Sequence, residues 1–415
     1  MRRKALAVLL LAVAVPPAAA APKAPTSLRA TRITTTSVTL AWRDRARNET
    51  RYELRAGSRR IRLRRNAHGA TVTGLRPDTG YVFRVRACRR SSCSALTRPL
   101  ARITRDPRGL RPPVVGGCQV FPAASPWNRD VRADPVDRYS ATYIAGSLAG
   151  HRVHLDFGST ERFYGFPWTL VPASQARTTT ITYGTDGADY GDESDHGPMP
   201  IPRGAPIEGW DGPGHDPDGG DRHVIALQQG TCKLYELYNA ERTTTGFRVS
   251  SSAIFDLMKT TLRPAGWTSA DAEGLPIFPG LLRYDEAATG EIRHAIRFTV
   301  QRAQRAYVAP ARHLGTQENP ACLPYGARLR LRASFPESPY RGPALAIIRA
   351  LKRYGMIFAD QGSAVYLSGS SDARWAPVIE TINSAHPIRG EDFEVLRLPS
   401  ISRDWKPSGP PSGSC

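Results

Sequence analysis

The sequence predicts a mainly β protein with two folded parts: a small N-terminal β-sandwich and a larger β-rich domain with a few helices. Segments such as Ser37–Trp42 alternate apolar and polar residues, which is the period of a half-buried strand. The 415 residues include 36 Gly and 35 Pro, which break the chain into many short segments. One run rich in both, residues 106–117, is expected to be the linker between the parts.

The first residues have the layout of a secretory signal. Arg2–Lys4 is positively charged, Ala5–Val15 is apolar, and Ala18–Ala21 offers small residues for cleavage. We therefore expect residues 1–22 to be removed and the protein to be secreted and extracellular. A membrane span needs about 20 apolar residues, and no segment of this chain is long and apolar enough, so we expect no span.

Residues 23–105 are expected to form the sandwich. Val38, Leu40 and Trp42 share one face of a strand, and Tyr81 begins a later strand of the same kind. The segment Leu75–Val85 reads LRPDTGYVFRV and carries a Leu-x-Pro-x-Thr-x-Tyr corner. With the early Trp, this corner resembles that of fibronectin type III domains, and the resemblance implies a β-sandwich.

The positive charge of the chain is concentrated at its N-terminal end. Residues 1–113 contain 26 of the 57 Lys and Arg but only 5 of the 37 Asp and Glu. Many of these arginines alternate with apolar residues and should project from strands. They indicate either a cationic surface for an anionic polymer of the cell envelope or a general preference for Arg at solvated positions. Export makes nucleic acid an unlikely partner.

Residues 118–404 are expected to form one domain with a sandwich or jelly-roll-like layout, followed by an irregular tail, residues 405–415. The expected strands are Thr178–Tyr183, His223–Leu227, Cys232–Ala240, Glu291–Val300 and Ala327–Ser334. The expected helices are Pro343–Tyr354, Ser251–Lys259 and Val378–Ile382. This part resembles an uncharacterised family of secreted bacterial proteins in Asp192–Pro202, Asp221–Val224, Leu234–Tyr238, Arg283–Glu286, Gly290–Ala295 and Tyr354–Asp360. The resemblance implies no activity.

The six cysteines indicate three disulfides in an exported protein. Cys88 and Cys93 flank a presumed hairpin turn and should pair with each other. The other four allow three pairings, of which we favour Cys118 with Cys415 and Cys232 with Cys322.

No standard catalytic signature is present, so the candidate site rests on clusters of ionisable residues. Asp192, Glu193 and Asp195 lie in an acidic loop, which is either solvated or neutralised by a cation such as Ca²⁺. His223 and Glu236 lie on neighbouring expected strands. Glu291 and Arg293 share one face of another, and His294 lies on the opposite, apolar face, where a hydrogen-bonded core role is favoured.

These clusters give one set of residues for each role. The catalytic candidates are Glu236, Glu291, Arg293 and His223, and the substrate-binding candidates are Trp210, Arg222, Tyr284 and His294. Paired carboxyl groups are typical of glycoside hydrolysis. We expect a secreted protein that acts on or binds extracellular polysaccharide or another envelope polymer. The alternatives are a glycoside hydrolase or other polysaccharide-cleaving enzyme, and a non-catalytic carbohydrate-binding or envelope-structural protein.

Overall fold

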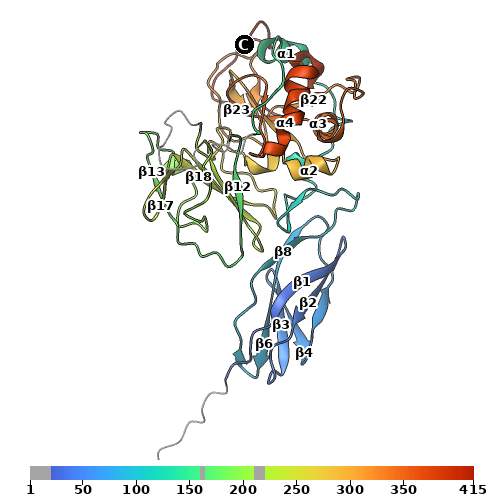
Figure 1. Ribbon diagram of the computed structural model, residues 1–415, viewed down its shortest axis with the longest axis vertical. Coiled ribbons are helices and arrows are strands. Elements are labelled where there is room, and N and C mark those ends of the chain that lie inside the picture. The colour runs from blue at the N-terminus through green and yellow to red at the C-terminus, as the bar shows by residue number, and fades with distance from the viewer. Residues whose placement is uncertain (1–19, 159–163, 210–219) are drawn as a thin grey trace, which may run out of the picture.

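The computed structural model describes residues 20–158, 164–209 and 220–415. The chain is mainly β with a few helices, as the sequence predicts. Two parts follow one another along the long axis, and strand β8 (Leu100–Ile103) of the first part lies nearest the second (Figure 1). The expected signal peptide, residues 1–22, falls almost wholly outside the described residues.

The first domain is a sandwich of two antiparallel sheets. One sheet has the order β1 (Thr26–Ile33), β2 (Val38–Arg43), β5 (Gly69–Val72); the other has the order β4 (Arg59–Arg64), β3 (Arg51–Ala56), β6 (Gly80–Arg89), β7 (Ser92–Cys93), and β8 also pairs with β6. Val38, Leu40 and Trp42 meet Tyr52 and Phe83 in its core. Cys88 and Cys93 pair across the end of the β6–β7 hairpin, which confirms that prediction.

The first domain packs directly against the second. Both carboxylate oxygens of Asp78 accept backbone N–H groups of the second domain, from Ala123 at 2.8 Å and Ala124 at 2.9 Å. Gly80 has no Cβ, and a Cβ there would lie 2.5 Å from the Met258 carbonyl oxygen. Ala101 of β8 is buried in a core that belongs mostly to the second domain. The segment between the domains therefore joins two bodies in contact.

The first half of the larger domain consists of two small sheets packed face to face. A four-stranded sheet has the order β12 (Trp168–Val171), β14 (Val224–Gln228), β15 (Lys233–Tyr238), β18 (Ser251–Asp256), and a three-stranded sheet has the order β13 (Thr180–Tyr183), β17 (Gly246–Val249), β16 (Glu241–Arg242). Val171, Tyr235 and Phe247 are buried between them. The helix predicted over Ser251–Lys259 is wrong, because β18 pairs antiparallel with β15 along its whole length.

The second half is built on a six-stranded mixed sheet. Its order is β11 (His154–Leu155), β24 (Tyr366–Leu367), β19 (Ile296–Val300), β23 (Met356–Gln361), β22 (Arg328–Leu331), β25 (Phe393–Val395). Helices α1 (Ser140–Ser147), α2 (Tyr284–Ala288), α3 (Gly342–Arg353) and α4 (Ala376–Ile379) accompany it, and α4 continues as a π-helical turn, Glu380–Ala385. The helices predicted over Pro343–Tyr354 and Val378–Ile382 are confirmed.

Short elements complete the fold. A second three-stranded sheet has the order β21 (Pro324–Tyr325), β20 (Gln304–Tyr307), β26 (Ser402–Arg403), and β9 (Val114–Val115) pairs with β10 (Cys118–Gln119). The 3₁₀ turns are η1 (Pro126–Asn128), η3 (Gly191–Glu193), η4 (Phe278–Gly280), η5 (Ala373–Trp375) and η7 (Gly390–Asp392).

The two long-range disulfides differ from the favoured pairing. Cys118 pairs with Cys232, and Cys322 pairs with Cys415. Strand β10 lies beside the turn between β14 and β15, where Gln229 Nε2 donates to the Gly116 carbonyl at 3.0 Å, so Cys118 meets the cysteine of that turn. Cys415 meets Cys322 because the tail returns to the segment before β21, where Asn319 Nδ2 donates to the Ser414 carbonyl at 2.9 Å.

Candidate functional site

A group of ionisable side chains is enclosed where the two halves of the larger domain meet. We call Asp271, Glu273, Arg297 and Asp360 the buried ionic cluster. Asp271 and Glu273 come from the loop after β18, Arg297 from β19, and Asp360 from β23. On β19, Ile296 and Phe298 point into the helix-covered core. Since side chains alternate along a strand, Arg297 points to the other face, toward the first half of the domain.

Arg297 is the centre of this cluster. Its Nε donates to Asp271 Oδ2 at 2.6 Å and its Nη2 donates to Asp271 Oδ1 at 2.5 Å, which is a two-pronged ion pair. The same Nη2 lies 3.4 Å from Asp360 Oδ2, so the two aspartates are neighbours. Nη1 donates to Ser368 Oγ at 2.7 Å, and the Phe166 ring lies over the guanidinium.

Two of the three carboxyl groups of the cluster have raised pKa values. Burial, followed by the charge of Asp271, raises the pKa of both Glu273 and Asp360 well above the ordinary values. Glu273 is fully buried, and neither of its carboxyl oxygens has a hydrogen-bond partner among the described residues. The Asp360 side chain is 23% exposed, whereas that of Asp271 is 1% exposed. Asp360 is therefore the acid of the cluster that solvent can reach.

The cluster thus combines carboxyl groups of raised pKa with a carboxylate held by arginine. Asp360 lies beside Asp271, whose negative charge Arg297 stabilises, and its Oδ1 accepts the backbone N–H of Gln361 at 2.7 Å. A buried acid whose pKa is raised by a neighbouring charge is a candidate for a functional site.

His223 lies next to this cluster, on the other side of Phe166. Its Nδ1 is 2.5 Å from Glu208 Oε2, its Nε2 is 2.9 Å from the Ala270 carbonyl, and its ring packs on Phe166. Burial opposes the charged form, but Glu208 outweighs it and raises the pKa of His223 to about 9. Both ring nitrogens are engaged, so His223 acts as a buried cation that positions the loop of Asp271.

Two of the catalytic candidates lie close together, since the charge of His223 acts on Glu236, whereas Glu291 and Arg293 form a pair near the surface. The Glu236 carboxylate accepts the backbone N–H groups of Ile277 at 3.0 Å and Phe278 at 2.9 Å. Burial raises the pKa of Glu236 to about 7, against these two bonds. Glu291 lies near the surface and pairs with Arg293 at 2.7 Å, and it shares no partner with Glu236. The strand predicted over Glu291–Val300 begins only at Ile296, so the expected shared face of Glu291 and Arg293 does not exist.

The substrate-binding candidates are spread over several elements. His294 is fully buried and lies 3.0 Å from Glu286 Oε2, so the favoured core role is confirmed. Tyr284 packs edge-on against Trp375. Arg222 is buried and bonds Asp186 and Asn239. Trp210 lies outside the described residues.

The acidic loop is neutralised by an arginine. Arg263 Nη1 donates to Asp195 Oδ2 at 2.6 Å, and its Nη2 donates to the Glu193 carbonyl at 2.7 Å. Glu193 Oε2 accepts the backbone N–H of Thr268 at 2.7 Å, and Asp192 lies in the same turn, η3. Among the described residues, no three His, Cys, Asp or Glu side chains are arranged to hold a metal ion, so the Ca²⁺ expectation gains no support from this loop.

Sequence reasoning missed the members of the buried ionic cluster. Arg297 offered a signal, because it stands between Ile296 and Phe298 on an otherwise apolar strand. Asp360 offered another, because it follows the apolar run Met356–Ala359. A charge in such a strand is costly unless it is paired or functional. The loop that brings Asp271 and Glu273 to these strands has no periodicity, so their meeting could not be inferred.

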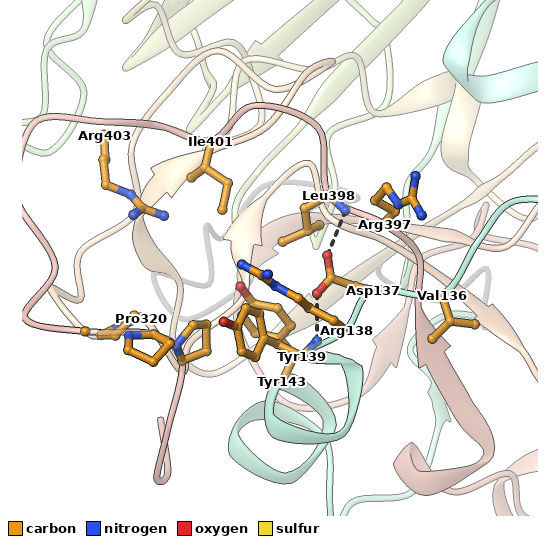
Figure 2. A pocket seen from close by; sticks show the side chains of 13 residues that line it. Val136, Asp137, Arg138, Tyr139, Tyr143, Pro320, Arg397, Leu398, Ile401 and Arg403 are labelled. Atoms are coloured by element: carbon orange, nitrogen blue, oxygen red, sulfur yellow. Dashed lines mark hydrogen bonds between the residues drawn. The ribbon is translucent and has the colours of Figure 1, made fainter.

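A separate cavity of about 590 Å³ lies beside the C-terminal tail. Tyr139 and Tyr143 line one side, and Arg138 and Arg403 reach toward its centre while Arg397 points away (Figure 2). Asp137 is held by the backbone N–H groups of Tyr139 and Leu398. Tyr143 is buried and the Arg138 guanidinium lies over the Tyr139 ring, so the guanidinium groups are the polar groups that this cavity offers to an anion.

Residues 23–101 match the family model of the fibronectin type III domain. Solved structures similar to this chain include three domains of chicken CNTN1 (18% identity, 20% of this chain and 30% of that chain, TM-score 0.19) and one domain of human contactin 1 (21% identity, 23% and 89%, TM-score 0.20). Another is the FN5 domain of Drosophila Lar (24% identity, 20% and 97%, TM-score 0.18). No curated protein matched this chain.

The disulfides and the fibronectin type III domain are consistent with an extracellular protein. Within the three described stretches, no helix has the length and apolar character needed to cross a membrane.

Proposed function

We propose that this is a secreted enzyme that hydrolyses an extracellular polysaccharide, with Asp360 of the buried ionic cluster as its general acid. The observation that carries the proposal is the raised pKa of Asp360, which is partly exposed and lies beside Asp271 bound to Arg297. Hydrolysis of a glycosidic bond needs a carboxyl group that donates a proton to the leaving oxygen, and a raised pKa suits that role.

Each residue has a distinct role in this proposal. Asp360 is the general acid, because its pKa is raised and its side chain reaches solvent. Asp271, buried and bound to Arg297, is a positioning residue whose negative charge raises the pKa of Asp360. Arg297 positions both through one guanidinium group, and Glu273 keeps the interior of the cluster neutral.

The test compares D360N with E291Q on a panel of plant, fungal and bacterial polysaccharides, with detection of new reducing ends. Asn at position 360 cannot donate the proton, so kcat should fall by about 10²–10⁴-fold, the usual contribution of general acid catalysis. Glu291 is a surface carboxylate in an ion pair with Arg293, so E291Q should keep the activity of the unmodified protein. Equal activity of D360N and the unmodified protein would remove Asp360 from the reaction.

The second candidate function is non-catalytic binding of an anionic carbohydrate, supported by the guanidinium groups of Arg138 and Arg403 in the cavity beside the C-terminal tail. In that case the protein should retain a polysaccharide of the panel without releasing products. R138Q should then weaken retention, and D360N should not. Product release from any polymer of the panel would exclude a purely binding role.

A further inference from the structure

The outer face of one sheet of the first domain carries an array of arginines. Tyr52, Leu54 and Ala56 of β3 point into the core, so Arg51, Glu53 and Arg55 point outward. We call the charged outward residues of the three adjacent strands β4, β3 and β6 the arginine face, and they are Arg60, Arg62, Arg64, Arg51, Glu53, Arg55, Arg84 and Arg86. Seven of its eight members are cations.

The register places like charges directly opposite one another. Arg55 faces Arg60 on one side and Arg84 on the other, and Arg51 faces Arg64. Directly opposite side chains in a sheet have Cβ atoms about 5 Å apart, and like charges there are destabilising. Uncharged polar residues would suit the same exposed positions without this repulsion. An arrangement that opposes stability without a local gain indicates a function.

Only the centre of the arginine face is neutralised. Glu53 pairs with Arg86 at 3.0 Å and with Arg55 at 3.3 Å. Within the described parts of the chain, Arg60, Arg62, Arg64 and Arg84 have neither a hydrogen bond nor an ion pair, and all four are exposed. These guanidinium groups are free to bind anions from solution.

We propose that the arginine face binds a linear polysaccharide that carries carboxylate groups. Its cations repeat at about 5 Å across the strands and at about 6.7 Å along each strand, so an extended polymer with regularly spaced anions can meet several of them at once. Guanidinium groups form two-pronged bonds with carboxylates. The outward positions of these strands hold no aromatic ring, whereas single-stranded nucleic acid is usually held by base stacking.

The arginine face continues into the domain contact. Val82 lies on the same side of β6 as Arg84 and Arg86, and it is paired with Ala101 of β8. Ala101 is buried against the second domain, and its N–H donates to the Gly230 carbonyl at 2.8 Å. A polymer laid along the arginine face is therefore held beside the larger domain. This inference does not depend on whether the larger domain cleaves the polymer.

The test measures binding of the full chain to immobilised polygalacturonate. It compares two triple variants, R60Q/R62Q/R84Q on the arginine face and R29Q/R32Q/R43Q as the control. Both triple variants lose three positive charges from exposed arginines of the first domain, but the second set lies on the other sheet. The first set should weaken binding about tenfold or more at low salt, which corresponds to three exposed ion pairs. The second set lies away from the arginine face, so it should change binding by less than about threefold. Binding should weaken further at about 0.1 M salt, where exposed charges are screened.

Methyl-esterified polygalacturonate, polyphosphate and single-stranded DNA are the comparison polymers. The proposal expects the esterified polymer to bind weakly, because it has lost its carboxylates. Equal weakening by the two triple variants, or no binding by the unmodified protein, would overturn it. Stronger binding to polyphosphate or DNA than to polygalacturonate would also overturn it, because a phosphate polymer would then be the partner. Melting temperatures of both variants that are no lower than that of the unmodified protein exclude unfolding as the cause.

Discussion

At the residue scale, the buried ionic cluster contains more carboxyl groups than its arginine neutralises. Arg297 binds Asp271 with two bonds and Asp360 with one long contact, while Glu273 has no partner among the described residues. A protonated carboxyl group is the state that such surroundings stabilise. The carboxyl groups of Glu273 and Asp360 therefore keep their protons to a higher pH in the folded protein than in the unfolded chain.

This difference predicts how E273Q changes stability with pH. Because the pKa of Glu273 is raised in the folded state, its contribution is fully present below the unfolded value of about 4.3 and is lost as pH rises toward the folded pKa. Gln imitates the protonated acid and does not titrate. We expect E273Q to be more stable than the unmodified protein above neutral pH, by about 1–3 kcal/mol, and similar to it at pH of about 4.

Urea unfolding of both proteins across this pH range measures the effect, and E291Q is the control. The pKa of Glu291 is lowered, mainly by Arg293, so the ion pair of Glu291 strengthens as pH rises and E291Q should lose that small gain. If the free energy of unfolding changes with pH in the same way for E273Q and the unmodified protein, folding does not raise the pKa of Glu273.

At the element scale, the arginines that we propose to bind a polymer also destabilise their own sheet, because they repel one another. Arg55 stands between Arg60 and Arg84, and Glu53 alone supplies negative charge on this face. The strands hold because Tyr52, Leu54, Phe83 and Val85 are buried beneath them. Burial of one such side chain contributes about 1.5–3 kcal/mol, more than repulsion between exposed charges removes.

R84E should therefore stabilise the first domain while it weakens polymer binding. A glutamate at position 84 faces Arg55, so a repulsive pair becomes an attractive one, with a gain of about 0.5 kcal/mol at low salt. Thermal unfolding at low and high salt measures this gain, which should shrink as salt screens the charges. R43E on the other sheet is the control, because Arg43 faces Thr26. A lower melting temperature for R84E at low salt would contradict the prediction.

The same scale shows what the sequence could reveal. Leu345, Ile348 and Leu351 repeat with helical period, and the helix forms there because one apolar stripe is enough to bury it. Ser251–Lys259 has no such decisive pattern, and pairing with β15 determines its conformation. The buried ionic cluster depends on four side chains from one loop and two strands. Local periodicity carries no information on contacts between residues 271 and 360, so the site could not be predicted.

At the scale of the whole molecule, the contact between the domains depends on a few specific bonds. Asp78 accepts two N–H groups of the second domain, and Gly80 leaves room for Met258. Ala101 adds apolar burial at the same contact. Such a contact fixes where the arginine face lies relative to the larger domain, which a flexible linker would not do.

D78A should loosen this contact without unfolding either domain. Loss of two hydrogen bonds to a charged group should weaken the contact by about 3–6 kcal/mol, and the segment of residues 106–117 should then be cleaved faster by trypsin after Arg108. Timed proteolysis and calorimetry measure the change, and D78N, which can still accept a bond, is the control. Cleavage at an unchanged rate would mean that apolar burial alone holds the domains together.

The disulfides also determine how the protein would respond to a pulling force. If the first domain holds a polymer and the C-terminus is pulled, tension passes from Cys118 directly to Cys232 and from Cys322 directly to Cys415. The residues inside each of these covalent loops bear no load. Within the larger domain, residues 233–321 are the part between the two loops that can be drawn out. The segment that carries Asp271, Glu273 and Arg297 therefore yields, while Asp360 stays in a shielded loop.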